Sequence, residues 1–413
     1  MPCNVLHSQK TIMYALFLDL KMDVLKKIEK QFCMKILLIS LNSIHAARWI
    51  ENLEESEHDL YWYDILGRGQ IETKGTVNQI LNTSKRKLPY IKGEFWMSKK
   101  LPNFYRLIYP YLATTENEVL EKIIKEINPD IIHSFEMQSC SYPIIKTMYK
   151  FPEIKWIYSC WGSDLFYYQN IKRHNIKIKK ALSRINFIHT DCLRDYQIAK
   201  DLGFKGKHVG IIPGGTGYKL KDLENLKLDF SKRKIILVKG YQHRFGRSIN
   251  VVKALQQCLP VLSECEVVLF GAHQQVVDYV KQNNLPFVTF GRNDLSQNQV
   301  MQLMGKSLLY IGNSISDGMA NTLLEAIAMG AFPIQSNPGN VSAEIIENGI
   351  NGLLIEDPEN VDLISGLINQ AIVNKEMLRN AYTINEKIAQ EKLEYRDNQQ
   401  KVINMYRNLQ ASL

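Results

Sequence analysis

Residues 314–340 read SISDGMANTLLEAIAMGAFPIQSNPGN, and this stretch decides how the second half of the chain is organised. Its middle predicts a short helix, because Leu323 and Ile327 belong to a set of apolar residues at helical spacing. Asp317 can accept hydrogen bonds from the free N–H groups of a first helical turn, and Gly330 is typical of a helix end. The stretch therefore predicts a helix that begins near Asp317 and ends near Gly330.

Strands are predicted on both sides of this helix, at residues 308–312 and 332–335, so the unit is a strand, a loop, a helix and a second strand. The start of such a helix binds anions, because unpaired N–H groups and the helix dipole face the ligand there. Two carboxylates, Asp317 and Glu325, frame this position, and eight residues of helix span about 12 Å. Each carboxylate can accept hydrogen bonds from two sugar hydroxyls. Taken alone, either residue is better explained as a helix cap or a surface carboxylate.

The whole stretch resembles the donor-binding signature of family 4 glycosyltransferases of GT-B fold, in which two acidic residues flank this loop and helix. In that family the first acid contacts the donor sugar and the second holds the ribose. Here the pattern is D-x7-E, with Asp317 in place of the usual glutamate and Glu325 at the second position. The resemblance continues through residues 338–368 and, with weaker motifs, from about Met34 to the C-terminus.

The resemblance implies an α/β protein with two Rossmann-like parallel-sheet domains that face a cleft, and a C-terminal helix that crosses back to the first domain. We expect five segments along the chain. They are an N-terminal extension (1–33), an acceptor-binding domain (34–218), a linker (219–231), a nucleotide-sugar-binding domain (232–385) and the crossover helix (386–413). The extension is open to three interpretations: a membrane-surface helix, a packing helix, or sequence upstream of a start at Met34.

The donor site is expected on the second domain. In the family a basic pair in the loop after its first strand binds the donor diphosphate. Here this loop offers Arg247 as the first choice, since its planar fork suits phosphate oxygens, then Arg244 and Lys239. The sequence FGRND resembles the turn beside the nucleotide base. The predicted donor-binding residues are Glu325, Lys239, Arg244, Gly291, Arg292, Gly318, Met319, Ala320 and Asn321.

Three apolar segments of the first domain (129–136, 155–164 and 186–191) predict strands that end in polar residues, at the sheet edge where ligands bind. WGSD in the second of them resembles the H-G-S-D turn of the family, with Trp161 in place of histidine. Acceptor-cleft candidates are Asn42, His45, His133 and Asp164, and the candidate catalytic residues are Asp317, Arg247 and Glu136. A surface or capping histidine explains His45 equally well, and an internal histidine explains His133.

Composition is that of a globular enzyme, with 413 residues, 45% hydrophobic and 23% charged. This length favours two domains. Seven cysteines are scattered without C-x-x-C spacing or histidine partners, which indicates reduced thiols in a cytoplasmic protein and no metal site. No apolar run reaches the length of a membrane span.

The net charge of +9 lies in the first half, because residues 1–213 hold 31 Lys/Arg and 22 Asp/Glu, whereas residues 214–413 hold 20 of each. Two basic clusters stand out, at 85–100 and 172–184. They indicate either a solvated face or contact with an anionic partner such as a membrane at its inner surface. Nucleic acid is disfavoured as a partner, because no nucleic-acid-binding motif accompanies the charge.

The resemblance implies a retaining, metal-independent transferase that uses a nucleotide-diphosphate sugar as co-substrate, needs no cofactor, and serves a glycan or lipid-linked acceptor in cell-surface polysaccharide synthesis. Two alternatives remain open. One is a sugar-nucleotide epimerase or glycoside phosphorylase of the same fold. The other is a degenerate transferase that acts as a membrane-surface scaffold, an idea motivated by Asp317, Trp161 and the basic first domain.

Overall fold

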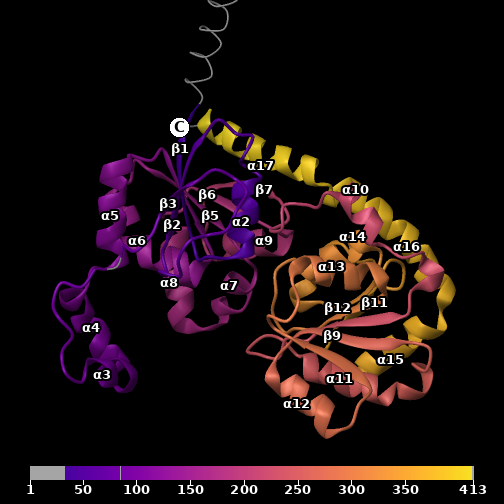
Figure 1. Cartoon of the computed structure of the whole chain (residues 1–413). Helices are drawn as coiled ribbons and strands as arrows, with labels where there is room; N and C mark the ends of the chain where they lie inside the picture. Colours follow the sequence, from indigo (N-terminus) through magenta and orange to yellow (C-terminus); the bar gives the residue numbers. More distant parts are fainter. Residues whose placement is uncertain (1–32, 84, 412–413) are drawn as a thin grey trace, which may run out of the picture.

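The computed structural model describes residues 33–83 and 85–411 (Figure 1). The expected N-terminal extension, apart from its last residue, lies outside this range, as does the suggested membrane-surface helix. Within the described ranges, no helix is long and apolar enough to cross a bilayer.

The first domain is built on a seven-stranded sheet in the order β3-β2-β1-β4-β5-β6-β7, and every neighbouring pair is parallel. Strands such as β1 and β4 are buried on both faces, which explains their uninterrupted apolar sequences KILLIS and IIHSF. The strands are β1 (Lys35–Ser40), β2 (Asp59–Asp64), β3 (Asn78–Ile80), β4 (Ile131–Phe135), β5 (Lys155–Ser159), β6 (Phe187–Thr190) and β7 (Lys207–Ile211).

The second domain carries a six-stranded parallel sheet in the order β10-β9-β8-β11-β12-β13. The two strands predicted around the deciding helix are confirmed as β11 and β12, which pair directly. The strands are β8 (Ile235–Lys239), β9 (Glu266–Ala272), β10 (Phe287–Gly291), β11 (Ser307–Gly312), β12 (Phe332–Ser336) and β13 (Leu353–Ile355).

Helices cover both faces of each sheet. In the second domain α11, α12 and α15 pack on one face, and α13 and α14 pack on the other (Figure 1). The helices are α2 (Ile44–Glu51), α3 (Glu94–Lys100), α4 (Pro102–Leu112), α5 (Glu116–Ile127), α6 (Ile145–Lys150), α7 (Ser163–Phe166), α8 (Lys172–Leu182), α9 (Leu193–Asp201), α10 (Leu220–Leu223), α11 (Ser248–Gln257), α12 (Gln274–Gln282), α13 (Gln297–Lys306), α14 (Asn321–Met329), α15 (Val361–Val373), α16 (Lys375–Ile388) and α17 (Tyr395–Gln410).

The deciding helix is α14, and it begins four residues later than the sequence predicts. Ala320 is its N-cap, and no side chain caps it. The Asp317 carboxylate instead accepts a hydrogen bond from the N–H of its neighbour Gly318 at 3.0 Å. Residues 317–320 therefore form a loop ahead of the helix. The predicted end is confirmed, because Gly330 adopts the left-handed conformation with φ of 74°.

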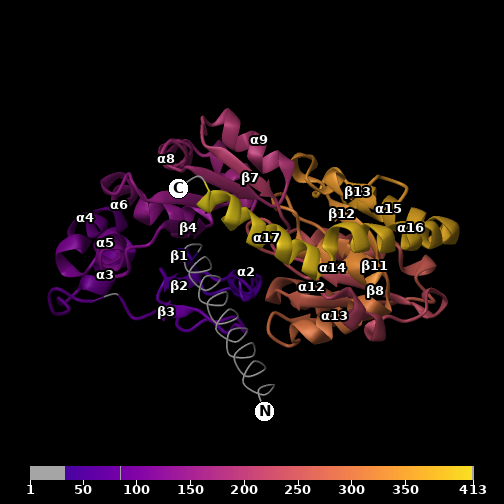
Figure 2. The ribbon, with the colours of Figure 1, turned by 90° about the horizontal axis from the view of Figure 1, so that it is seen from above.

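The last helix, α17, leaves the second domain and packs on the first, as Figure 2 shows from above. Its Val402 and Tyr406 are fully buried in one core with Ile36 and Trp62. The Tyr406 hydroxyl accepts a hydrogen bond from the Trp49 indole at 3.0 Å. These contacts confirm the predicted architecture of two Rossmann-like domains joined by a helix that crosses back.

Candidate active site

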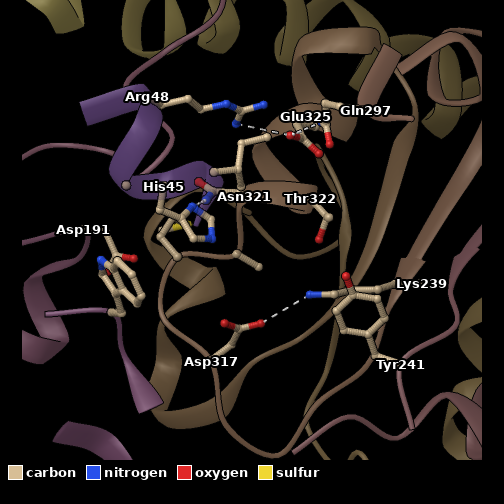
Figure 3. Close-up of a pocket in the computed structure, with 15 residues that line it drawn as sticks. His45, Arg48, Asp191, Lys239, Tyr241, Gln297, Asp317, Asn321, Thr322 and Glu325 are labelled. Carbon is tan, nitrogen blue, oxygen red and sulfur yellow. Dashed lines mark hydrogen bonds and ion pairs between the residues drawn. The ribbon is translucent and has the colours of Figure 1, made fainter. Parts of the chain in front are cut away.

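A cavity of about 310 Å³ opens between the two domains, beyond the carboxyl ends of β8 and β11 (Figure 3). Both domains contribute side chains to it. The first domain supplies Ile44, His45, Arg48, Trp161, Asp191 and Gly214. The second supplies Lys239, Tyr241, Gln297, Asp317, Met319, Ala320, Asn321, Thr322 and Glu325.

One wall of the cavity holds an ion pair between Lys239 and Asp317. Lys239 is the last residue of β8, and its Nζ lies 3.7 Å from Oδ2 of Asp317 in the loop before α14. Burial is the largest single effect and lowers the pKa of Lys239, but Asp317 together with Tyr310, Tyr241 and Glu325 raises it, and the pKa lies above its usual value. Lys239 therefore stays charged and faces the cavity as a fixed cation.

The opposite wall holds Glu325, a buried carboxylate on α14. Its Oε1 accepts a hydrogen bond from the Gln297 amide at 2.7 Å and lies 3.6 Å from Nη1 of Arg48. Burial raises the pKa of Glu325, and Arg48 opposes that shift. Because Arg48 comes from α2, this ion pair joins the two domains across the cavity.

His45 and Asn321 form a second contact between the domains. The Asn321 side-chain amide lies 2.9 Å from Nδ1 of His45, and the His45 ring meets Trp161 edge to face at 5.5 Å. Burial, followed by the nearby charge of Arg48, lowers the pKa of His45 to about 4. The imidazole is therefore neutral near pH 7, so its Nδ1 accepts the hydrogen bond that Asn321 donates.

Asp191 brings a further carboxylate from the end of β6 into the cavity. Burial raises the pKa of Asp191, and its Oδ1 is buried without a hydrogen-bond partner. A side chain at Gly318 would place a Cβ only 2.7 Å from Oδ2 of Asp191, so the loop needs glycine there. Among the described residues, Asp191, Cys192 and Asp195 hold donor atoms within 4.8 Å of one another. Arg194 lies 2.7 Å from Asp195, and this cation disfavours a metal ion.

The WGSD turn of the first domain packs directly on the donor loop. Gly162 has φ of 88°, and a Cβ there would lie 2.1 Å from the backbone nitrogen of Gly318. Only glycine satisfies both the conformation and the contact. The turn therefore fixes how closely the first domain approaches residues 317–320.

The structure places the predicted Arg247 and Arg244 outside the cavity. The Arg247 guanidinium is hydrogen-bonded to Glu359 and to the carbonyl oxygens of His243, Arg244 and Gly246. The Arg244 guanidinium lies over the ring of Tyr167 at 4.7 Å. These partners engage both side chains, and neither lines the cavity, so their contact with the donor diphosphate stays a prediction. Of the three basic candidates, Lys239 lines the cavity.

Gly291 and Arg292 also lie outside the cavity lining. The Gly291 N–H donates to the Asp294 carboxylate at 2.6 Å, and Arg292 is exposed. Within the predicted donor loop, Met319, Ala320 and Asn321 line the cavity, whereas Gly318 lies behind them against Gly162 and Asp191.

Four candidates of the first domain have structural partners and do not line the cavity. Asn42 donates to the Gln70 carbonyl at 2.8 Å. His133 is fully buried and bridges Tyr406 at 2.5 Å and Ser159 at 2.7 Å, which is the internal role that the sequence left open. The other two, Glu136 and Asp164, are held by backbone N–H groups.

Glu136 follows β4 and accepts hydrogen bonds from the N–H groups of Gln138 and Ser139. Burial, with the charge of Asp164 second, raises the pKa of Glu136 to about 7. Asp164 accepts from the N–H of Met137 at 3.0 Å and from the Tyr158 hydroxyl at 2.5 Å. Both carboxylates are therefore held by hydrogen bonds within the turns of the first domain. Neither Glu136 nor Asp164 lines the cavity, although the sequence had suggested both as site residues.

Sequence reasoning missed Arg48, Gln297, Asp191, Tyr241 and Thr322. Arg48 follows His45 by one helical turn, so a helix over this segment puts both on one face, and that spacing was a usable signal. Asp191 ends a predicted strand beside the ligand-binding edge, which was a second signal. Nothing in the local sequence marks Gln297.

Two family models match the chain. Residues 224–388 match the model described as "Glycosyl transferases group 1", and residues 110–194 match the model described as "Glycosyl transferase 4-like". Together they cover more than half of the chain. No curated protein matches it.

Solved structures of similar architecture include a sucrose-phosphate synthase from Thermosynechococcus elongatus, with 16% identity, a TM-score of 0.68, and coverage of 92% of this chain and 100% of that one. HepE of Anabaena in complex with UDP-glucose has 14% identity, a TM-score of 0.61, and the same coverage of 92% and 100%. The lipopolysaccharide outer core galactosyltransferase WaaB, in its apo form, has 15% identity, a TM-score of 0.61, and coverage of 92% and 100%. At these identities the likeness shows the fold.

The two family matches fall on the two domains whose sheets frame the cavity, and the shared fold extends over nearly the whole chain. On this evidence the protein is a glycosyltransferase of GT-B fold that belongs to the group 1 family.

Proposed function

We propose that this enzyme transfers a sugar from a UDP-sugar to an acceptor hydroxyl, with retention of the anomeric configuration and without a metal ion. The observation that carries the proposal is the position of Asp317 and Glu325 on opposite sides of the cavity, with Lys239 beside them (Figure 3). The choice of uridine rests on solved structures of the same fold in complex with UDP or UDP-glucose.

The proposed donor lies with its ribose at Glu325, its diphosphate at Lys239 and its sugar near Asp317. A carboxylate accepts hydrogen bonds from both hydroxyls of a diol, which suits Glu325 to the ribose. The ammonium group of Lys239 and the N–H groups of Ala320 and Asn321 at the start of α14 would offer positive charge to the phosphates. Arg48 and Gln297, which now engage Glu325, would share it with the ribose.

In the reaction the bond between the anomeric carbon and the phosphate oxygen breaks, and a bond to the acceptor oxygen forms. Negative charge develops on the leaving UDP, and a fixed cation beside it lowers the barrier. Lys239 would supply the charge that a divalent ion supplies in other transferases. We propose that the acceptor attacks from the face that UDP leaves, so that its proton passes to the departing phosphate oxygen and the configuration is retained.

The acceptor we propose is a glycan or a lipid-linked sugar, in cell-surface polysaccharide synthesis at the cytoplasmic face of a membrane. The six described cysteines are unpaired, which is typical of a reducing compartment. The similar fold of a lipopolysaccharide transferase favours this acceptor class.

The test combines binding and product analysis. Calorimetry with UDP and a panel of UDP-sugars should show binding by the wild type, and Glu325→Gln should weaken it about 10- to 100-fold, since a hydrogen bond to a charged group contributes about 1.5–3 kcal/mol. Glu359→Gln is the matched control, because Glu359 pairs with Arg247 outside the cavity.

Transfer should persist in a chelator, and nuclear magnetic resonance of the product should show the donor's anomeric configuration. Inversion, a metal requirement, or wild-type UDP affinity in Glu325→Gln would contradict the proposal. Sugar release by free phosphate, or epimerisation without acceptor, would assign one of the alternative activities of this fold.

A further inference from the structure

A helical hairpin stands out from the first domain, on the side away from the second (Figure 1). This arm, residues 85–113, contains α3 and α4 and is inserted between β3 and α5. Its two ends are tied together at the neck, where the Lys87 N–H donates to the Leu112 carbonyl at 2.9 Å and the Thr114 N–H donates to the Lys85 carbonyl at 2.9 Å. The arm is therefore an ordered projection with a defined base.

A polar cluster, rather than an apolar core, holds the arm together. Glu94 is buried and forms a two-pronged ion pair with Arg86, with Nη1–Oε1 and Nη2–Oε2 distances of 2.6 and 2.8 Å. The Tyr105 hydroxyl donates to the same carboxylate at 2.9 Å. Leu112 is the one described apolar residue of α3 and α4 that is buried. The remaining apolar side chains of these helices are half-buried or exposed.

The arm exposes large apolar and aromatic side chains. On α4, Phe104, Leu107 and Tyr111 are 53, 72 and 75% exposed, and their spacing places them on one face of the helix. On α3, Phe95 and Trp96 are 71 and 59% exposed. A cluster of this kind on a water-soluble surface marks a place where a partner binds.

The charge of the arm is strongly positive. Residues 85–112 contain seven Lys/Arg and a single acidic residue, Glu94, which Arg86 neutralises. Lys92, Lys99, Lys100 and Arg106 are exposed. These cations are interleaved with the aromatic rings, and the Lys99 ammonium lies 4.2 Å from the centre of the Phe95 ring. The partner therefore presents negative charge together with an apolar layer.

We propose that the arm docks on a bilayer that contains anionic lipids, with its aromatic side chains at the headgroup boundary and its lysines on the lipid phosphates. Trp, Tyr and Phe beside Lys and Arg are the side chains that settle at this boundary. The other basic cluster, at residues 172–184, lacks comparable exposed aromatic side chains. Helix α8 carries exposed lysines, but its exposed large apolar residue is Ile176 alone, and the adjacent Arg184 is buried against backbone carbonyls. The arm is thus the membrane-facing part of the basic first domain.

This docking is independent of the donor chemistry, because no arm residue lines the cavity. Docked in this way, the arm holds the first domain at the membrane surface, which is where a lipid-linked acceptor resides. The proposal stands or falls on lipid binding, whatever sugar the enzyme transfers.

The test is flotation of the full chain with phosphatidylcholine vesicles, with and without phosphatidylglycerol, at low and high salt. The wild type should float with the anionic vesicles at low salt and be released by high salt. Replacing Lys92, Lys99 and Lys100 with Gln should weaken binding about a hundredfold, since each cation near the surface contributes about fivefold. Replacing Lys177, Lys179 and Lys180 of α8 with Gln is the matched control and should leave binding nearly unchanged.

Apolar insertion has its own variant and reporter. Phe95→Ser with Leu107→Ser should reduce binding, whereas Val373→Ser, at a 72% exposed position of the second domain, should not. Trp49, Trp62 and Trp156 are buried and Trp161 lines the cavity between the domains, away from the arm. The exposed Trp96 should therefore report docking as a blue shift of fluorescence that is absent in Trp96→Phe.

Thermal melting and UDP binding must match the wild type in every arm variant, which separates loss of docking from loss of folding. Lack of flotation by the wild type would overturn the proposal, as would equal losses in the arm and α8 variants. Arm-dependent self-association in sedimentation, without vesicle binding, would show that the arm binds a second copy of the chain and would likewise overturn it.

Discussion

The Arg48 guanidinium of the first domain lies 3.6 Å from the Glu325 carboxylate of the second, across the cavity between them. The same carboxylate is the proposed ribose site. The ion pair therefore connects the approach of the two domains with the ionisation of the proposed ribose-binding carboxylate. The pKa of Glu325 depends on Arg48, a residue of the opposite domain.

Replacing Arg48 with Gln should make donor binding more sensitive to acid. Burial raises the pKa of Glu325 and Arg48 opposes this, so removing Arg48 raises the pKa further. Because the ribose hydroxyls donate to the ionised carboxylate, UDP affinity falls as the pH drops through this pKa, and the fall should begin at higher pH in Arg48→Gln. Calorimetry of UDP binding as a function of pH measures the midpoint. An unchanged or lower midpoint would refute the coupling.

Replacing Lys239 with Ala should lower turnover far more than replacing Arg247 with Ala. Lys239→Ala removes the cation that lies in the cavity, and we expect a loss of about 10²–10³ in kcat, the range seen when one stabilising donor is removed. Arg247→Ala should lower turnover far less, because its guanidinium is held by Glu359 and loop carbonyls outside the cavity. Steady-state kinetics with a saturating donor distinguishes the two. Equal losses of kcat in the two variants would show that Arg247 also acts on the reacting groups.

Gly162→Ala should disturb the donor loop rather than the stability of the first domain. The added methyl would lie 2.1 Å from the Gly318 nitrogen, so the loop must move or the domains must separate. Gly203→Ala is the control, because Gly203 also has a positive φ, of 96°, but has no atom within 4 Å of the added carbon.

Both glycine variants carry the same kind of backbone strain, and only the first clashes. We expect the donor KM to rise in Gly162→Ala while the two melting temperatures fall by similar amounts. A similar KM in both variants would show that the close approach of the turn has no role in donor binding.

His45 should contribute to a loss of stability in acid. Its pKa is lowered to about 4 in the folded protein, chiefly by burial, against 6.5 for an ordinary histidine. The folded state therefore binds fewer protons than the unfolded state, and this group lowers the free energy of unfolding as the pH falls from 6.5 towards 4, with no effect above 6.5.

In His45→Gln the side chain can still accept from Asn321 but cannot titrate. Its melting temperature should fall less than that of the wild type between pH about 7 and about 5, the range over which an ordinary histidine gains its proton. Parallel curves for the two proteins would show that His45 does not titrate on unfolding.

The sequence was sufficient for the fold because apolar periodicity is a local property. Strands β11 and β12 and helix α14 were all readable from a single stretch, and the spacing of Asp317 and Glu325 placed both in one cavity. The sequence predicts too early a start for α14 because an aspartate before a helix is typical of an N-cap. The Asp317 carboxylate instead accepts a hydrogen bond from the N–H of Gly318 and forms an ion pair with Lys239.

The partners that engage Arg247 and His133 are remote from them in sequence. Arg247 is engaged by Glu359, which lies 112 residues further on, and His133 by Tyr406, which lies 273 residues further on. No spacing rule detects such pairs, since they exist only when the sheets and α17 are assembled. A basic loop residue and a histidine at a strand end therefore look the same in sequence whether they face a ligand or a carbonyl.

Helix α17 also determines the order in which the two domains can fold during synthesis. The core of the first domain includes Val402, Met405 and Tyr406 of α17, which are translated only after the whole second domain. The second domain, continuous from β8 to α16, has all its strands available earlier. The first domain, although it is translated first, keeps Ile36 and Trp49 uncovered until α17 has been made. A nascent chain, or one cut before α17, is therefore a natural substrate for chaperones and proteases.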